Sequence, residues 1–595
     1  MQSVAHFFYK NIHFLSNSFT SRHIFENALT LVPSFDNIKT KTKRGADMNI
    51  FIENLGMGKE SFEVLFHTAS RLFANREIKL SELKSDADYT VKVSLNCEYS
   101  NDRYTIEPFA EGVVLSGAND ASAHAAFGRF LMESTFDGRG GFVPTERRID
   151  FTPKRPLRGM YFATHFYNFY HTAPIEKVYE VIEDLAFEGC NNILVWFDMH
   201  HFGSTKDEGA QALIERLREI IRFANKIGIK GSLTMLSNEG FASSPKHLRA
   251  SWEAIGNYHM KPDGHYHVEI CPSKEGGIEE IIRERREVLE CFADLDIAYC
   301  CYWPYDQGGC TCPDCEPWGA NGFIKLLPAF KKVQKEILPN SELIISTWYF
   351  DRFIKGEWDA FYPYLESGEL GDAAYIMSFF FGGVMPECIS KKGIPSGYKF
   401  IDFPEISMYS CSPWGGFGAS ALPHFLGVTN ERNGALYSGG FPYSEGIFED
   451  VNKFISLSYY SGLYENSNDA VRAYVRFNYC VDGEALDELT EVIIKSEVGL
   501  ARVKDPERVA YQIQNGEHVS WVRSVMKKYN ATLPEKIRSS YKFRLYYLRS
   551  IIDSELLSHG GAPNDSELCR EAMREVNEIY HATERTASCV KAPLI

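Results

Sequence analysis

The chain of 595 residues lacks features that identify several whole classes of protein. It contains no uninterrupted run of about 18 apolar residues, so we expect no transmembrane helix and no membrane partner. The first residues, MQSVAHFFYKNIHFLSNSF, mix apolar side chains with His, Lys and Asn, and they lack the continuous apolar stretch of a secretory signal. These two absences predict a soluble, cytoplasmic protein.

Basic residues and cysteines are also scarce. The 63 Lys and Arg are outnumbered by 79 Asp and Glu, and the formal net charge of −16 argues against nucleic acid as a partner. Fourteen cysteines are too few for a fold held by disulfides, and outside a group between Cys300 and Cys315 we interpret them as small buried residues. Aromatic residues are plentiful at 14%, which suits the stacking of sugar rings, although most must belong to the core.

The N-terminal part of the chain divides into a leader and a small domain. Residues 1–47 end in the basic stretch KTKTKRG, and we expect them to be a disordered leader outside the fold. Residues 48–150 predict a small α/β domain. Alternating apolar residues indicate a strand over 89–95, GVVLSG indicates another over 112–117, and Ala-, Phe- and Leu-rich residues indicate a helix over 121–132.

Short apolar runs then alternate with helical stretches, which is the pattern of βα units and a parallel sheet. Eight such units lie within residues 155–456 and predict a (β/α)8 TIM barrel. We expect Thr172 to cap the first helix of this region, with Pro174 in its first turn and Gly189 at its end. The expected strands are 157–163, 191–197, 230–236, 297–303, 343–348, 373–379, 398–408 and 434–440.

Beyond the predicted barrel the strand pattern stops. Apolar side chains at i+3 and i+4 spacing, such as Ile537, Tyr541 and Leu545, indicate helices, so we expect residues 457–595 to form a helical C-terminal domain. The predicted fold class is therefore α/β, a TIM barrel with a small N-terminal α/β domain and a helical C-terminal domain.

In a TIM barrel the active site lies at the carboxyl ends of the strands, so the polar residues near these ends are the candidates. Glycoside hydrolysis needs a carboxylic acid that protonates the leaving oxygen and a carboxylate that attacks or activates water. We predict Asp306 as the general acid and Glu445 as the second carboxylate or a hydroxyl anchor. Strand-end carboxylates can instead cap the following helices, and this alternative stays open. The residues expected to bind the sugar are Arg158, His165, Asp198, His200, Glu239, Trp348, Asp351, Glu405, Trp414 and Tyr443.

A small α/β domain followed by KRPLRGMYFATHF resembles the start of the barrel in family 20 β-N-acetylhexosaminidases and their relatives, the α-glucuronidases and α-N-acetylglucosaminidases. The resemblance implies that Arg158 grips sugar hydroxyls. It also implies that Asp306 lies where the hexosaminidases carry an adjacent Asp-Glu pair. Glu445, in FPYSEGIFED, would correspond to the Glu of a Trp-x-Glu segment that binds sugar hydroxyls.

The chain departs from the hexosaminidase pattern at Gln307, which follows Asp306 where a Glu is expected. A neutral amide cannot supply the charge that substrate-assisted catalysis requires. Either Asp306 acts alone as the acid, with Glu445 or Glu405 as the second carboxylate, or the substrate lacks an N-acetyl group. The preferred function is an exo-acting glycoside hydrolase on an oligosaccharide or glycoside. A catalytically silent carbohydrate-binding barrel is the alternative, and a sugar isomerase is a third possibility.

The segment CTCPDC carries three thiols, Cys310, Cys312 and Cys315, and with Cys301 nearby they could form a tetrahedral structural zinc site. A cluster of reduced thiols or a redox-labile pair is the alternative. No His lies at ligand spacing, so we expect no catalytic zinc and no other cofactor for catalysis. Adjacent His200 and His201 point in different directions on a strand end, which favours substrate binding or packing over metal binding.

Overall fold

A computed structural model gives the structure of the protein. It describes residues 48–76, 78–136, 141–251, 268–305, 309–352, 354–378, 380, 385–407, 417–503, 510–559 and 566–586. The predicted leader, Asp306 and Trp414 lie outside the described residues. Within the described ranges, no helix is both long enough and apolar enough to cross a membrane.

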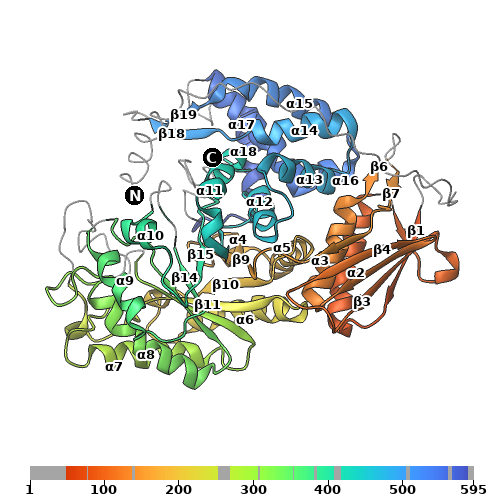
Figure 1. Ribbon diagram of the computed structural model, residues 1–595. Helices are drawn as coiled ribbons and strands as arrows, with labels where there is room; N and C mark the ends of the chain where they lie inside the picture. The colour runs from red at the N-terminus through yellow and green to blue at the C-terminus, as the bar shows by residue number, and fades with distance from the viewer. Residues whose placement is uncertain are drawn as a thin grey trace.

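The N-terminal part is a six-stranded sheet with two long helices, drawn in red and orange in Figure 1. The strand order is β2-β1-β3-β5-β4-β8, and the predicted strands 89–95 and 112–117 are β3 and β5. A capping box starts α3, because the Asn119 side chain accepts a hydrogen bond from the backbone N–H of Ser122, whose hydroxyl accepts one from the N–H of Asn119. The elements are β1 (Asn49–Asn54), α2 (Lys59–Ala74), β2 (Lys79–Leu80), β3 (Tyr89–Leu95), β4 (Tyr104–Phe109), β5 (Gly112–Gly117), α3 (Asp120–Glu133), β6 (Thr135–Phe136), β7 (Phe142–Val143) and β8 (Ile149–Phe151).

The middle of the chain is a closed parallel barrel of eight strands, so the predicted TIM barrel is confirmed. Seven of the eight expected strands occur within about three residues of their predicted bounds. The exception is the strand expected over 398–408, which ends at Asp402, so that Glu405 follows the strand instead of lying within it. The barrel closes where β16 and the short β17 pair with β9. The eight strands are β9 (Leu157–Phe162), β10 (Asn192–Trp196), β11 (Lys230–Leu236), β12 (Ile297–Trp303), β13 (Glu342–Ser346), β14 (Tyr375–Met377), β15 (Phe400–Asp402) and β16 (Tyr437–Gly440), and the short β17 (Tyr443–Ser444) extends the eighth along β9.

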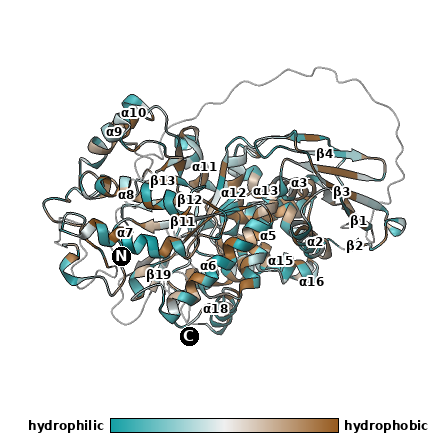
Figure 2. Cartoon of the chain, turned by 90° about the horizontal axis from the view of Figure 1, so that it is seen from below, coloured by the Kyte–Doolittle hydropathy of each residue, from teal (hydrophilic) through white to brown (hydrophobic). Residues whose placement is uncertain are grey.

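Helices surround these strands, and their sequences are amphipathic. In α6, Leu213, Leu217 and Ile221 are buried against the barrel while the charged residues face outward, and Figure 2 shows teal and brown residues along this helix. The helices of the barrel region are α4 (Phe169–Thr172), α5 (Ile175–Phe187), α6 (Glu208–Lys226), α7 (Gly277–Glu290), α8 (Gly322–Ile337), α9 (Glu357–Ser367), α10 (Glu387–Lys392), α11 (Pro423–Asn433) and α12 (Asp450–Ser461).

The start of α5 differs from the prediction. Pro174 occupies the N-cap position of α5, and no side chain caps the helix. Thr172 instead ends the short α4. Proline fixes its own φ and so separates the two helices at this point. Gly189 follows the end of α5 with a φ of 88°, a conformation that suits glycine, as the sequence predicts.

The C-terminal part consists mainly of helices, shown in blue in Figure 1, but it also contains a β-hairpin. Antiparallel β18 (Gly499–Val503) and β19 (Ala510–Gln514) contradict the expectation that strands stop beyond the barrel. The hairpin is anchored where Tyr511 packs edge-on against Phe417 at 5.0 Å. The helices are α13 (Ser467–Tyr479), α14 (Gly483–Lys495), α15 (Val519–Thr532), α16 (Glu535–Arg538), α17 (Tyr541–Ser558) and α18 (Glu567–Ile579).

Candidate active site

We call the carboxyl ends of the barrel strands the barrel mouth. On its first side, the loop after β9 carries His165 at 5% exposure, and its ring meets Trp196 edge-on at 5.1 Å. The His165 Nε2 lies 3.5 Å from the Tyr443 hydroxyl, and its Nδ1 has no hydrogen-bond partner among the described residues. Burial lowers the pKa of His165 to about 3, so the ring is neutral at physiological pH. The next two residues, Phe166 and Tyr167, have φ values of 56° and 55°, which mark a strained turn at the mouth.

Glu445 lies in a buried turn after β17, where the Tyr443 hydroxyl lies between it and His165. Glu445 is only 2% exposed, and its Oε1 accepts a hydrogen bond of 2.8 Å from the Tyr443 hydroxyl. Burial, reinforced by the negative charge of Glu405, raises the pKa of Glu445 well above 4.5. The turn itself is fixed by Glu449, whose Oε1 accepts hydrogen bonds from the backbone N–H groups of Glu445 at 2.6 Å and Gly446 at 2.7 Å.

Glu405 follows β15 and is brought next to Glu445. It pairs with Tyr443 through an isolated parallel bridge, it is half-buried, and it accepts a 2.8 Å hydrogen bond from the backbone N–H of Ser407. The Ser407 hydroxyl donates to the Tyr443 carbonyl at 2.9 Å and accepts from the Glu445 N–H at 3.1 Å. Ser407 therefore locks the two carboxylate-bearing segments together.

A second polar group lies across β10 and β11. Glu239 is fully buried, and its Oε1 lies 2.6 Å from the Nδ1 of His200 while its Oε2 accepts a 3.3 Å hydrogen bond from the Trp196 indole. Burial and the charge of Glu239 raise the pKa of Asp198 well above its ordinary value. The exposed His201 lies 3.4 Å from Asp198, so two histidines and a carboxylate converge here, contrary to the expectation that His200 and His201 diverge.

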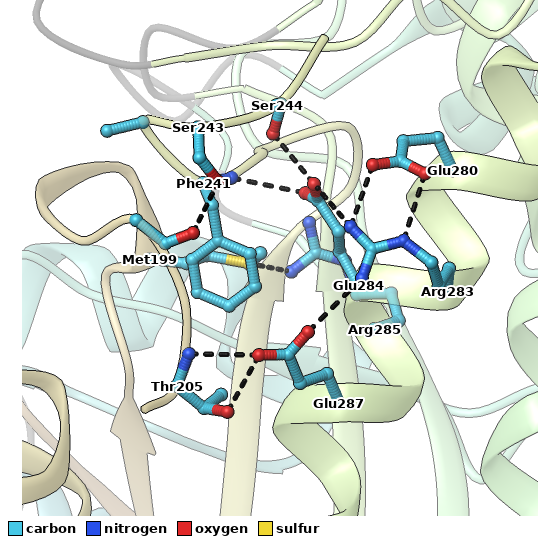
Figure 3. A network of polar contacts seen from close by, with 12 residues as sticks. Met199, Thr205, Phe241, Ser243, Ser244, Glu280, Arg283, Glu284, Arg285 and Glu287 are labelled. Atoms are coloured by element: carbon cyan, nitrogen blue, oxygen red, sulfur yellow. Dashed lines mark hydrogen bonds and ion pairs between the residues drawn. The ribbon is translucent and has the colours of Figure 1, made fainter. Parts of the chain in front are cut away.

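Helix α7 packs behind Glu239, and Figure 3 shows the contacts that its Glu284 and Arg285 make with Phe241, Ser244 and Met199. Buried Arg285 donates hydrogen bonds to the carbonyl of Glu239 and to the sulfur of Met199. Glu284, also buried, accepts from the backbone N–H of Phe241 at 3.1 Å. These residues were missed from the sequence because they lie in a run of charges. The helical spacing does indicate that Arg285 is buried, since it follows buried Ile281 by four positions and so falls on the apolar face of the helix.

Aromatic side chains form one wall of the mouth. Trp348 is half-buried, and its ring lies 5.7 Å from Trp303 and meets Phe403 edge-on at 5.4 Å. Tyr443 joins the same wall, 6.0 Å from Phe403. Aromatic rings of this kind suit the apolar C–H face of a sugar ring.

Two predicted sugar-binding residues are engaged elsewhere. The Asp351 carboxylate accepts a 2.8 Å hydrogen bond from the N–H of Glu357 at the start of α9, which is the capping role that the sequence left open. Arg158 is the second residue of β9 and lies at the opposite end of the barrel. Its guanidinium donates to Asp102 of the N-terminal sheet at 2.6 Å and to the carbonyls of Arg155 and Gly189. The expectation that Arg158 grips sugar is therefore corrected.

The predicted thiols lie together beside the mouth, but with a different fourth partner. Cys310, Cys312 and Cys315 cluster with Cys271, so the prediction that Cys271 is only a small buried residue is wrong. Cys301 instead faces the barrel interior, where it packs among Trp196, Trp303 and other apolar side chains.

Comparisons with known proteins give the fold a context. No protein-family model matches the chain, and no curated protein does. A solved family 89 glycoside hydrolase from Clostridium perfringens, in complex with its substrate GlcNAc-α-1,4-galactose, is similar with a TM-score of 0.56 at 12% identity over 84% of this chain. A family 115 4-O-methyl-α-glucuronidase gives 0.57 at 9% identity over 93%, and a family 138 enzyme targeting pectin rhamnogalacturonan II gives 0.53 at 10% over 92%.

The chain has the fold of these glycoside hydrolases. The fold is therefore similar to that of an α-glucuronidase, one of the relatives that the sequence resemblance includes. This chain spans 61% of the length of the Clostridium perfringens enzyme, 78% of the α-glucuronidase and 76% of the family 138 enzyme.

Proposed function

We propose that the chain is an exo-acting glycoside hydrolase that removes a terminal sugar of hexosaminide or uronide type. The observation that carries this proposal is the pair of carboxylates, Glu405 and Glu445, which are joined through Ser407 at the barrel mouth. Carboxylic acid chemistry beside an aromatic wall is what cleavage of a glycosidic bond requires. The similar enzymes act on a GlcNAc glycoside and on 4-O-methyl-α-glucuronides, and this supports the two sugar classes proposed.

The two glutamates differ in their surroundings, and we derive their roles from this difference. Burial keeps the pKa of Glu445 well above 4.5, so its carboxyl retains a proton. Glu405 is half-buried, and its negative charge is one of the causes that raise the pKa of Glu445. Paired carboxyls with opposite preferences divide acid and base roles between them. Within the pair, Glu405 thus carries the charge that attacks or activates water, and Glu445 carries a proton and anchors a sugar hydroxyl.

We propose Asp306 as the general acid because in the sequence it comes shortly after Trp303, the last residue of β12, and active-site residues of TIM barrels follow the strands. His165, Asp198, His200, Glu239, Trp348, Trp414 and Tyr443 complete the proposed sugar pocket. Neutral His165, with its free Nδ1, is suited to a hydrogen bond with a sugar hydroxyl. No cofactor takes part in the proposed chemistry.

The test is turnover of aryl and alkyl glycosides of N-acetylglucosamine and glucuronic acid in both anomeric forms. Asp306→Asn and Glu405→Gln should each lower kcat by about 10²–10⁴, because lost acid–base chemistry has that cost. Glu445→Gln alters the proposed hydroxyl anchor and should mainly raise KM. Asp306→Asn should lose more on alkyl than on nitrophenyl glycosides, since a good leaving group needs less protonation. Glu431→Gln, on the exposed surface of α11, is the matched control. A variant that stays within about tenfold of wild type refutes the role of its residue.

A catalytically silent sugar-binding barrel is the competing function, and Gln307 is the feature that favours it. Calorimetric titration with the free sugars separates the two. Binding of a sugar with no turnover of any glycoside in the panel would establish the silent protein and refute the hydrolase.

A further inference from the structure

Four thiols converge beside the barrel mouth, and we call them the thiol cluster: Cys271, Cys310, Cys312 and Cys315. Their Sγ atoms all lie within 4.8 Å of one another. The Sγ of Cys271 lies 3.7 Å from that of Cys312 and 3.8 Å from that of Cys315. Cys271 comes from the long connection between β11 and α7, and the other three come from the connection between β12 and α8.

These distances distinguish between the possible states of four cysteines. A disulfide would bring two sulfurs to about 2.05 Å, and the Sγ–Sγ distances in the cluster are far longer. A tetrahedral zinc ion with Zn–S bonds of about 2.3 Å sets its sulfurs about 3.8 Å apart. We propose that the thiol cluster binds one structural zinc ion, with Cys271 as the ligand that completes the tetrahedron. Four thiolates leave no open position on the metal, so it has no catalytic role.

The surroundings of the thiol cluster are those of a metal site. The backbone N–H of Ser251 points to the Sγ of Cys310 at 3.5 Å, and the Ser273 hydroxyl lies 3.1 Å from the Sγ of Cys315. Lys325 donates to the same serine hydroxyl at 3.2 Å, which brings a positive charge toward the cluster. A zinc ion with four thiolates carries a net negative charge, and outer contacts of this kind stabilise it.

The proposed zinc would hold two connections of the barrel mouth together. Asn238 bridges these two connections through hydrogen bonds. Its side-chain amide donates to the carbonyls of Ile270 at 3.1 Å and Gly309 at 2.8 Å, and its Oδ1 accepts from the Gly309 N–H at 3.0 Å. Ile270 precedes Cys271, Gly309 precedes Cys310, and Asn238 precedes Glu239. The metal would thus stabilise the turn that presents Glu239 to the mouth. It would act through rigidity, and its binding does not depend on the proposed hydrolase function.

The first experiment is elemental analysis of the full-length protein, purified in reducing buffer without chelator. We expect about one zinc per chain. Cys271→Ser and Cys312→Ser should lower the retained zinc at least about tenfold, whereas Cys97→Ser, at an exposed thiol of the N-terminal domain, should retain it in full. Less than about a tenth of a zinc per wild-type chain, or an equal amount of iron in its place, would overturn the proposal. Undiminished zinc in Cys271→Ser would overturn the assignment of the fourth ligand.

A second experiment uses wild-type protein alone and so remains decisive if the variants fail to fold. Protein stripped of metal and reloaded with Co²⁺ should show the visible absorption of tetrahedral cobalt bound by thiolates. Chelation should lower the midpoint of thermal unfolding by roughly 5 °C or more, because a structural metal binds only the folded state. A cobalt spectrum of octahedral type, or an unfolding midpoint that chelation leaves unchanged, would overturn the site.

Discussion

Glu357 offers a test of how the barrel mouth is held together, because its stability contribution should depend on pH. It is 1% exposed at the start of α9, and its carboxylate accepts hydrogen bonds from the Tyr305 hydroxyl at 2.6 Å, the Gly319 N–H at 2.7 Å and the Asp351 N–H at 2.8 Å. Burial outweighs these bonds and raises the pKa of Glu357 from 4.5 to about 7. One carboxylate therefore ties together the connections that follow β12 and β13.

The magnitude follows from the two pKa values. In the unfolded chain Glu357 loses its proton near pH 4.5, while in the folded chain it keeps the proton until about pH 7. Below pH 4.5 both states are protonated and the group contributes no pH dependence. As the pH rises from 4.5 to 7 the unfolded state is favoured, and above pH 7 the full penalty is present. At about 1.4 kcal/mol per pKa unit, this penalty is about 3 kcal/mol.

The perturbation is Glu357→Gln, which removes the titration and keeps a side chain of nearly the same shape. The free energy of unfolding of wild type minus that of the variant should fall by about 3 kcal/mol between pH 4 and pH 8. Thermal melts followed by circular dichroism across this range measure the difference. Glu366→Gln, at an exposed position of the same helix, is the control and should show no such trend. A difference between wild type and Glu357→Gln that stays constant with pH would refute the reasoning.

Two further predictions concern contacts between the barrel and its flanking domains. Tyr580→Phe removes a hydroxyl that donates a hydrogen bond to the Glu445 carbonyl at 2.8 Å, so kcat should fall several-fold with little change in KM. Tyr529→Phe on α15 is the control and should change neither kcat nor KM. An unchanged kcat for Tyr580→Phe would contradict the positioning role of Tyr580. Arg158→Lys breaks most of a buried contact with Asp102 and should lower the unfolding midpoint by several degrees with KM within about twofold of wild type. A tenfold rise in KM would restore Arg158 to the sugar pocket.

The barrel could be predicted from the sequence because its strands are covered on both faces. All six residues of β9 are buried, and such a strand appears in the sequence as a continuous apolar run between helical segments. The same logic put Glu405 and Glu445 among the candidates at the strand ends, since residues that follow parallel strands gather at one end of a barrel. The hairpin of β18 and β19 escaped prediction because its two five-residue strands lie between long helices.

Arg158 and Cys271 show two different limits of sequence reasoning. Arg158 stands at the beginning of its strand, so the rule that chemistry follows the strands already argued against it, and the family resemblance outweighed that rule. Cys271 could not be assigned, because it precedes Cys312 by 41 positions and loop closure of that length is compatible with many partners. Only the fold shows that β11 and β12 are neighbours and that the connections after them meet.

The C-terminal domain also contacts the candidate site, through Tyr580 at the end of α18. Tyr580 lies 135 positions after Glu445, is 1% exposed, and packs against Phe448 at 4.5 Å and Phe169 at 5.9 Å. A side chain added at Gly446 would meet its ring, so the turn after β17 and the end of α18 fit each other closely. A local pattern in the sequence gives the helix but not the surface on which it docks. The geometry of a carboxylate in the barrel therefore depends on a tyrosine from another domain, and a chain that ended before α18 would keep every predicted catalytic residue while losing the contact that fixes one of them.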